Sequence, residues 1–378
     1  MFTRRLSLLL FALMPATAMA AGSATTTVTI SRLDVVIRAT EQNPQVASAR
    51  AEIHRYEALQ NQVFAARFPT IGVQVGVATS LQAELVDENG ATSRRSAYKD
   101  FSFDQLSAAF LGRVLGTQPL YTFGKIDLRG EAATAGLRAS RAQVRMTQAG
   151  VALEAAKIYE GLLYAKAVLL FLDDIQGIAE KTLEQTEDLI DEGAPDVSIQ
   201  DILRVKSAQG LAELGRTEAE AGISQATEGL RAYLGLGKHA EIIPQDEYLA
   251  PISIQPTRVE DVIDLALNNR PEFDALKQGI LAFDKLAAAE AAGYFPNIFL
   301  AGLVTAAYTP GRQFTQSRYV FDPLGHFVPA ALIGAQWEIQ WDMAGQRAEE
   351  VRADAIKLTG LLKWAEQGIP AEVNQVYQ

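Results

Sequence analysis

The chain has 378 residues, of which 48% are hydrophobic, and a formal net charge of −11 at neutral pH. This acidic balance argues against a nucleic-acid partner, which would need a basic face. The sequence contains no cysteine, which excludes disulfides and thiolate metal sites. Its length suggests two or three domains.

The first twenty residues have the pattern of a secretory signal peptide. Arg4 and Arg5 supply positive charge, Leu6–Met14 is apolar, and Ala18-Met19-Ala20 forms an A-x-A cleavage site. Nine apolar-rich residues are too few for a membrane-spanning helix. We expect cleavage before Ala21, which removes two arginines and no acid and takes the net charge from −11 to −13.

Two helices and a strand are predicted next. Ser31 and Asp34 form an N-cap pair for a short helix that ends at Asn43-Pro44, and a second helix runs to about Arg67. Phe68-Pro69 ends that helix. Strict alternation then predicts a strand with one apolar face. The apolar positions are Ile71, Val73, Val75 and Val77, and the positions between them are Gly72, Gln74, Gly76 and Ala78.

A second strand is predicted after a polar, charged stretch from about Leu81 to Gln105. This candidate, Leu106–Gln118, has poor alternation, and Arg113 lies inside it. Residues Pro119–Lys125 close the strand. A long helical segment begins after them.

Residues 130–234 predict one long helical hairpin. Its first arm, about 60 residues, would extend roughly 90 Å, far beyond an ordinary globular helix. A seven-residue spacing of apolar and small residues favours packing against neighbouring helices. The stripe is Leu137, Val144, Val151, Ile158, Ala165, Leu172 and Ala179, joined by Ala155, Leu162 and Leu169. The second arm has many small residues, which allow neighbours to approach closely.

The turn of the hairpin is well marked. Gly193 can end the first arm in a left-handed conformation, and Pro195 prevents its continuation. Ser198 and Asp201 resemble a capping box for the second arm. The turn is acidic, which fits either a solvated hairpin end or a docking or gating surface. The candidate tip residues are Gly193, Pro195, Asp196, Ser198, Asp201 and Leu203.

The chain then repeats itself. Arg270-Pro271 lies 227 positions after Asn43-Pro44, and Phe295-Pro296 lies 227 positions after Phe68-Pro69, with no gap. We therefore divide the mature chain into a first repeat, a linker and a second repeat, each copy reading helix, strand, loop, strand, long helix. The boundaries are 21–237, 238–257 and 258–378. Thr257 and Glu260 are the expected capping pair of the second copy.

The second copy carries two further strand candidates. One begins at Ile298, and the last one alternates up to Trp341 before a new helix, with Gly345 corresponding to Gly124. Its apolar face would hold Ile333, Ala335, Trp337, Ile339 and Trp341, and its polar face Gly334, Gln336, Glu338 and Gln340. Strands of about ten residues cross an outer membrane when tilted, and tryptophans gather at its interfaces. Ordinary core packing is the alternative for the tryptophans.

No catalytic or cofactor-binding pattern is visible. The histidines His54, His239 and His326 are far apart and lack metal-ligand spacing. Nucleophile-elbow, P-loop, zinc-protease and dinucleotide motifs are absent from the sequence. We expect no enzyme, no cofactor and no metal site.

In its duplicated pattern the chain resembles the TolC-like outer membrane efflux protein family. The resemblance covers the whole mature chain and rests on the two copies, on the Pro-containing breaks and on two motifs. These motifs are Q-P-L-Y-T-F-G-K at Gln118–Lys125 and G-x-x-x-x-S-x-x-D-I-L at Gly193–Leu203. Each motif alone is weak, and their order makes the resemblance strong.

The resemblance implies a mainly α fold with a β-barrel part in the outer membrane. Three chains would each give four strands to a twelve-stranded barrel, and their helices would form a cylinder across the periplasm. Drugs or proteins would be exported passively, driven by an inner-membrane pump or ABC transporter through a periplasmic adaptor that meets the helical tips. Expected membrane-facing residues are Ile71, Val73, Val75, Val77, Ile298, Trp337 and Trp341; expected lumen-facing residues are Gln74, Gln336, Glu338 and Gln340.

One departure concerns the second hairpin. Tyr377 falls where Tyr159 falls in the first copy, so most of the second hairpin is missing from this sequence, and we expect the sequence to be a fragment. The acidic constriction residues that the family carries at that tip therefore cannot be assigned. A soluble periplasmic coiled-coil adaptor or scaffold is the competing interpretation, and an enzyme is the third.

Overall fold

A computed structural model describes residues 27–81, 106–247, 249, 258–310, 322–339 and 342–378. The predictions for the signal peptide, for the polar stretch around 82–105, and for Thr257, Gln340 and Trp341 lie outside these residues. The described chain forms two compact units, one within residues 1–44 and 150–252 and the other within 45–149 and 253–378.

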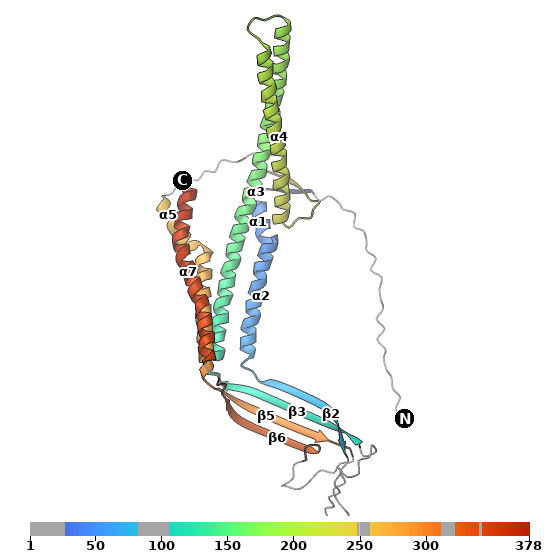
Figure 1. The fold of residues 1–378 in the computed structure, drawn as a ribbon, viewed down its shortest axis with the longest axis vertical. Helices are drawn as coiled ribbons and strands as arrows, with labels where there is room; N and C mark the ends of the chain where they lie inside the picture. The colour runs from blue at the N-terminus through green and yellow to red at the C-terminus, as the bar shows by residue number, and fades with distance from the viewer. Residues whose placement is uncertain (1–26, 82–105, 248, 250–257, 311–321, 340–341) are drawn as a thin grey trace, which may run out of the picture. The chain divides into compact units, whose positions relative to one another are not determined.

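The first unit contains most of the predicted hairpin. Helix α3 (Lys125–Asp191) enters this unit at Gly150, and α4 (Ile199–Tyr233) returns beside it (Figure 1). The first arm is 67 residues long, which confirms a rod far longer than an ordinary helix. At its base, β1 (Thr27–Ile30) pairs in parallel with β4 (Glu241–Pro244), next to α1 (Arg32–Gln42) in the chain.

The two arms of the hairpin pack through the predicted seven-residue spacing. Three glycines of α4 face three members of the α3 stripe, and a β-carbon on them would lie only 3.0 to 3.5 Å from the facing side chain. These pairs are Gly215 with Leu172, Gly222 with Ala165 and Gly229 with Ile158. Each set is spaced by seven residues, so the small residues of the second arm permit close approach at every second turn.

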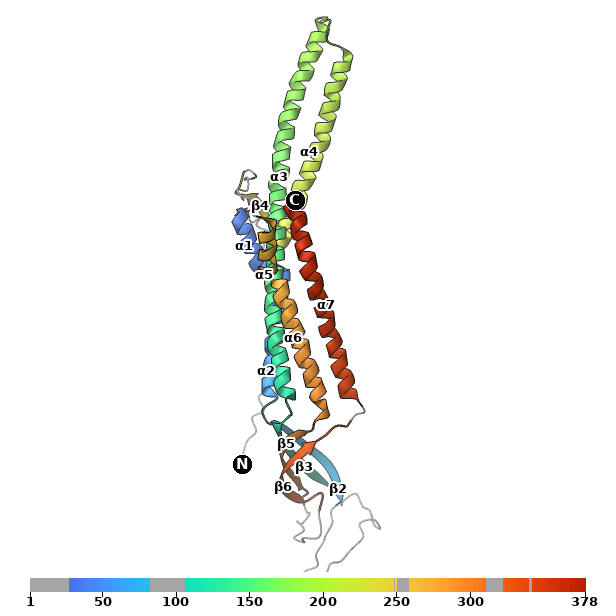
Figure 2. The ribbon, with the colours of Figure 1, turned by 90° about the vertical axis from the view of Figure 1, so that its left-hand side faces the viewer.

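The second unit joins a sheet to long helices. Its helices are α2 (Pro44–Ala65), α5 (Val259–Asn269), α6 (Pro271–Ala291) and α7 (Met343–Tyr377), together with the start of α3 and a short 3₁₀ turn, η2 (Ala292–Tyr294). Helices α6 and α7 run side by side (Figure 2). Phe273 of α6 packs with Ala365, Ile369 and Val373 of α7 in a buried cluster.

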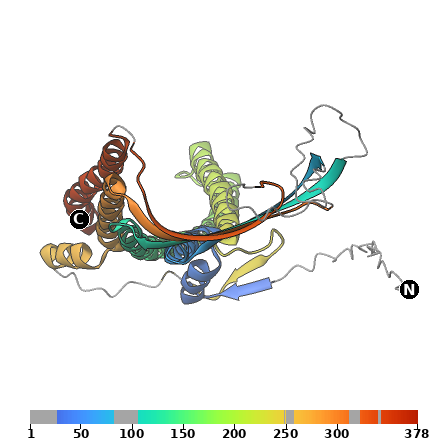
Figure 3. The same cartoon turned by 90° about the horizontal axis from the view of Figure 1, so that it is seen from below.

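The sheet is antiparallel throughout, in the order β2-β3-β5-β6. Its strands are β2 (Thr70–Leu81), β3 (Leu106–Tyr121), β5 (Asn297–Tyr308) and β6 (His326–Gln336). Seen from below, they form a single curved layer (Figure 3). Strands β2 and β6 lie at its two edges, and neither edge is paired within the described chain.

The first elements of the two copies follow the 227-residue offset seen in the sequence. Helix α5 begins 227 positions after α1, α6 begins 227 positions after α2, and β5 covers the positions 227 after those of β2. After β5 the offset shortens: β6 begins 220 positions after β3, and α7 begins 218 positions after α3. The gap-free alignment therefore extends through the first strand of each copy.

Three details of the second copy were predicted wrongly. Strand β6 ends at Gln336, so Trp337 and Glu338 lie outside a strand and the alternation does not orient them. Helix α7 begins at Met343, which places Gly345 inside it; Asp342, with φ +51°, takes the left-handed position before the helix. Arg258, which makes no side-chain capping hydrogen bond, is the N-cap residue of α5, one position after the cap that the sequence predicted.

Among the helices of the described chain, none contains an apolar stretch long enough to cross a bilayer.

Candidate channel wall and helical tip

One face of the sheet is apolar across all four strands. The register places Val73 beside Val114, Val304 and Pro329, and Val75 beside Gly112, Ala306 and Phe327. Ile71 and Val77 continue this face along β2, and Ile298 lies on the same face of β5. The four β2 side chains are 65 to 84% exposed. We call this surface the apolar face.

The opposite face is mixed and carries the polar side chains of the strand centres. Gln74 of β2 lies beside Arg113 of β3 and Thr305 of β5. On β5, Asn297 lies an even number of residues from Thr305 and therefore on the same face. Gln336, at the end of β6, pairs with Asn297 and shares that face. Gln74 and Gln336 therefore share one face, as predicted, and we call this surface the mixed face.

Arg113 carries more information than the sequence pattern indicated. It made the β3 candidate look poor, yet β3 is the longest strand, and Arg113 stands near its middle on the mixed face. Lysine or arginine on the lipid face at the bilayer midplane costs roughly 2–4 kcal/mol. The position of Arg113 and the composition of the apolar face thus indicate the same result: the apolar face is the side of the sheet that can contact lipid. Counting glycine as neutral in the alternation makes the predicted strand clearer.

The tip of the hairpin is built around Gly193, which adopts φ +77°. The Gly193 N–H donates to the Ile190 carbonyl at 3.0 Å, and the Ala194 N–H donates to the Leu189 carbonyl at 3.0 Å. This pair of bonds is a Schellman motif, in which glycine avoids the steric cost of the left-handed conformation. The predicted end of the first arm is confirmed.

The second arm begins at the predicted cap. The Asp201 carboxylate accepts hydrogen bonds from the Ser198 backbone N–H at 3.0 Å and from the Ser198 hydroxyl at 2.9 Å. These bonds from Ser198 lower the pKa of Asp201. Pro195, Asp196 and Leu203 are exposed around this cap. The six tip residues therefore form one surface at the end of the hairpin.

A polar cluster fixes the base of the hairpin within the first unit. The buried Tyr159 hydroxyl donates to the Asp246 carboxylate at 2.7 Å and to the Ile30 carbonyl at 3.1 Å. Asp246 also accepts from the Arg32 backbone N–H at 3.1 Å, and the Arg32 guanidinium pairs with Glu160. Burial, with the Asp246 bond, raises the pKa of Tyr159 to about 12. The cluster ties α1 and β4 to α3.

Where β3 and β5 meet the helices of the second unit, aromatic and cationic side chains gather. Lys125 donates to the Phe295 carbonyl at 2.6 Å and to Asn297 at 2.9 Å, and the Phe123 and Phe295 rings stack with centroids 5.2 Å apart. Trp337, 61% exposed, donates its indole N–H to the Tyr294 carbonyl at 2.9 Å. Trp337 thus lies just beyond the end of β6, and its hydrogen bond to Tyr294, instead of strand pairing, fixes its position.

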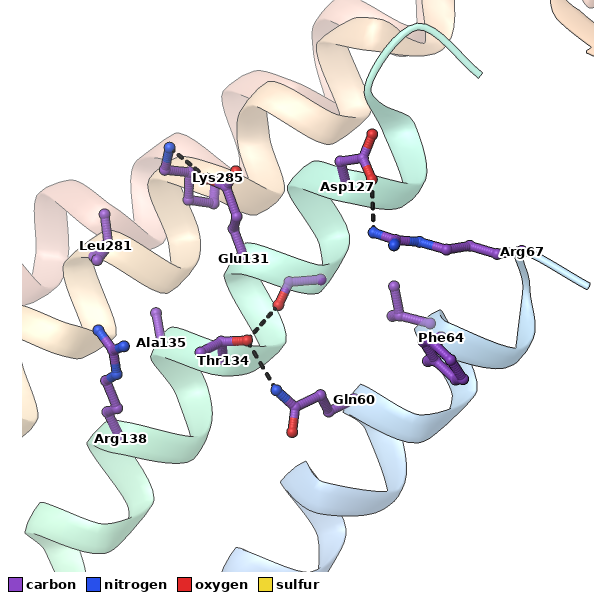
Figure 4. Close-up of a pocket in the computed structure, with 12 residues that line it drawn as sticks. Gln60, Phe64, Arg67, Asp127, Glu131, Thr134, Ala135, Arg138, Leu281 and Lys285 are labelled. Atoms are coloured by element: carbon purple, nitrogen blue, oxygen red, sulfur yellow. Dashed lines mark hydrogen bonds and ion pairs between the residues drawn. The ribbon is translucent and has the colours of Figure 1, made fainter. Parts of the chain in front are cut away.

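A groove of about 680 Å³ lies between α2, α3 and α6 in the second unit (Figure 4). Ion pairs cross it: Arg67 with Asp127 at 2.7 Å and Lys285 with Glu131 at 2.6 Å. The Gln60 amide donates to Thr134 at 3.0 Å. These bonds connect neighbouring helices, which indicates a structural role for the groove.

Within the described residues, no group of three or more His, Asp or Glu side chains is arranged to hold a metal ion. The strongest features are thus surfaces: the apolar face, the mixed face and the tip.

A family profile describing outer membrane efflux proteins matches residues 35–236. Solved structures of bacterial membrane proteins have the same fold. A membrane protein from Pseudomonas aeruginosa is 16% identical, with a TM-score of 0.67, and the match covers 89% of this chain and 74% of that one. No curated protein matched the sequence.

Two further structures agree. The CmeC outer membrane channel of Campylobacter jejuni is 14% identical, with a TM-score of 0.67, covering 88% of this chain and 66% of that one. The outer membrane protein VceC of Vibrio cholerae is 16% identical, with a TM-score of 0.66, covering 89% and 75%. At such identities the likeness establishes a TolC-like fold.

Proposed function

Because this chain belongs to the outer membrane efflux protein family, we propose that it forms the outer-membrane duct of a tripartite efflux or type I secretion system. The family places the protein in the outer membrane as an efflux channel. In our proposal, three copies close a twelve-stranded barrel, and their helices form a cylinder in the periplasm. Solutes then cross passively, and an inner-membrane pump or ABC transporter supplies the energy through a periplasmic adaptor.

The observation that carries this proposal is the open four-stranded sheet with one apolar face. In lipid, unpaired backbone groups at a strand edge cost several kcal/mol each, so the edges of β2 and β6 need partners. Four strands cannot close a barrel with an open lumen, because even eight strands leave an interior that side chains fill. Further copies of the same sheet supply matching edges.

The hairpin supports the same assembly. Tyr164, Phe171 and Ile178 of α3 are spaced by seven residues, and each is 62% exposed. Such a stripe, left uncovered by α4, is typical of a helix that packs against further helices. Neighbouring copies in a ring would cover it.

The tip supports the contact with the adaptor. The Schellman motif and the Ser198–Asp201 cap fix its backbone, while Ile199 and Leu203 are 70% and 61% exposed. A rigid surface with exposed apolar side chains and an acidic rim has the composition of a protein docking site.

A soluble periplasmic adaptor, the competing interpretation, accounts for the hairpin alone. It leaves an apolar four-stranded face in water, which is an aggregation hazard.

The test has two arms. Detergent-extracted protein from outer membranes should have the mass of three copies and should conduct ions in planar bilayers; a periplasmic monomer without conductance would refute the duct. For the tip, Gly193→Val should keep the trimer and its conductance but abolish export in cells, since a β-branched residue does not fit φ +77°. Gly193→Asn, which tolerates this conformation, is the matched control.

A further inference from the structure

Arg113 is the one Asp, Glu, Lys or Arg residue among the four described strands of the sheet. It lies near the middle of β3, which places it close to half the height of the strands. A single strong charge in the centre of an otherwise uncharged wall is expensive unless it faces water. Its position therefore calls for a functional explanation.

The described neighbours of Arg113 across the strands carry no negative charge. Its neighbours across the strands are Gln74 and Thr305, and its diagonal neighbours on β2 are Gly72 and Gly76. The two glycines have no side chains that could cover the guanidinium. Arg113 is exposed, and no carboxylate lies on the described strands.

We propose that three Arg113 side chains form a cationic ring inside the barrel, which enriches anionic solutes and depletes cations at this height of the duct. The proposal rests on the trimeric barrel of the proposed function. It assigns a substrate preference to the barrel itself: negatively charged solutes pass this ring more readily than positively charged ones.

The size of the barrel makes such a ring effective. With strands about 4.8 Å apart and tilted by about 40°, twelve strands enclose a radius of about 12 Å. The Debye length is about 30 Å at 0.01 M salt and about 10 Å at 0.1 M. Three unit charges at the wall then raise the chloride concentration on the axis about threefold at 0.01 M and less than twofold at 0.1 M, with potassium lowered equally.

The experiment measures the reversal potential of single channels in planar bilayers under a potassium chloride gradient. Replacing Arg113 by Gln should lower the chloride-to-potassium permeability ratio, by up to about tenfold near 0.01 M salt and less at higher salt. Arg113→Glu should lower it further, and Arg113→Lys should keep it. Gln74→Asn, a neutral change in the same row, should leave the ratio unchanged.

A second measurement uses the absence of cysteine from the chain. Arg113→Cys creates a unique thiol that a water-soluble methanethiosulfonate reagent can modify from the lumen. A positively charged reagent should restore the wild-type permeability ratio, and a negatively charged one should reverse it. Val114→Cys, the next residue on the apolar face, should not react in the membrane.

The outcomes separate the two proposals. If no variant and no wild-type protein conducts, the duct itself fails. If wild-type channels conduct but the permeability ratio is the same for Arg, Gln and Glu at position 113, the cationic ring is refuted while the duct stands. An unreactive thiol at position 113 in a conducting channel also refutes the ring.

Discussion

In each copy of the duplicated unit a short helix, a proline and a longer helix follow one another, but the residue before the proline differs. It is Asn43 in the first copy and Arg270 in the second. Both backbone N–H groups donate four residues back, to Ala39 at 3.2 Å and to Ala266 at 3.0 Å. The backbone at this corner is therefore the same in the two copies.

The side chains at this corner use different chemistry. The buried Asn43 amide donates to the Tyr233 carbonyl at the end of α4, at 3.1 Å. The Arg270 guanidinium instead makes two bonds to the Glu372 carboxylate of α7, at 3.0 and 3.1 Å. Duplication thus preserved the turn, while each copy acquired its own anchor: a buried neutral bond in one and a partly exposed ion pair in the other.

The largest expected contrast lies one turn further on, at Val46 and Phe273, which are 227 positions apart and both buried. Phe273→Ala should cost about 3–5 kcal/mol, because it opens a cavity against α7. Val46→Ala removes only two methyl groups, at about 0.8 kcal/mol each before any cavity is counted. Denaturant unfolding of the extracted protein compares the two; equal losses would mean that the copies are packed alike despite the difference in volume.

Asn43→Ala comes next. It leaves the partly buried Tyr233 carbonyl without its amide donor, which costs about 1–3 kcal/mol. Asn43→Asp is the matched control, since it keeps the shape but offers no N–H and should destabilise at least as much. A loss below that of Arg270→Leu would contradict the view that the buried anchor is the stronger one.

Tyr159→Phe tests, through its pH dependence, the polar cluster at the base of the hairpin. Because the pKa of Tyr159 is raised to about 12 from an unfolded value near 10, its contribution is complete below pH 10 and is lost as the pH rises toward 12. The variant should lose about 1 kcal/mol at neutral pH and show a shallower alkaline decline. Tyr377→Phe is the control, since Tyr377 is 45% exposed; identical alkaline curves for wild type and Tyr159→Phe would exclude this coupling.

Much of this architecture was predictable because it depends on local rules. The left-handed Gly193, the Ser31 and Ser198 caps and the Pro44 break each follow from the residue itself and its nearest neighbours. Repetition then carried the same elements to the second copy. The heptad stripe predicted that α3 packs on a helix, and the glycines of α4 supplied the facing surface.

The wrong predictions concern strand bounds, which depend on pairing between segments far apart in the sequence. Strand β6 starts at His326, well before the alternation at Ile333 becomes clear, because pairing with β5 extends it through Pro329 and two alanines. It stops at Gln336, where the register with Asn297 ends, although the alternation continues to Ile339. Likewise, Arg113 weakened the apparent pattern of β3, while the face it occupies is set by its partners Gln74 and Thr305.

The smallest expected effect belongs to the anchor of the second copy. Arg270→Leu should cost about 0.2–1 kcal/mol, since the Arg270 and Glu372 side chains are 31% and 57% exposed and water screens the pair. The Arg270 bond lowers the pKa of Glu372, so this contribution is present above the unfolded pKa of a glutamate and is lost as the pH falls through the lower folded value.

Added salt should weaken the wild type toward the variant, whereas it should leave the Asn43→Ala difference unchanged, because the Asn43 bond joins two neutral groups. Unfolding midpoints at low and high salt give both differences, and a salt-independent Arg270 effect would show that the side chain stabilises the corner by packing alone.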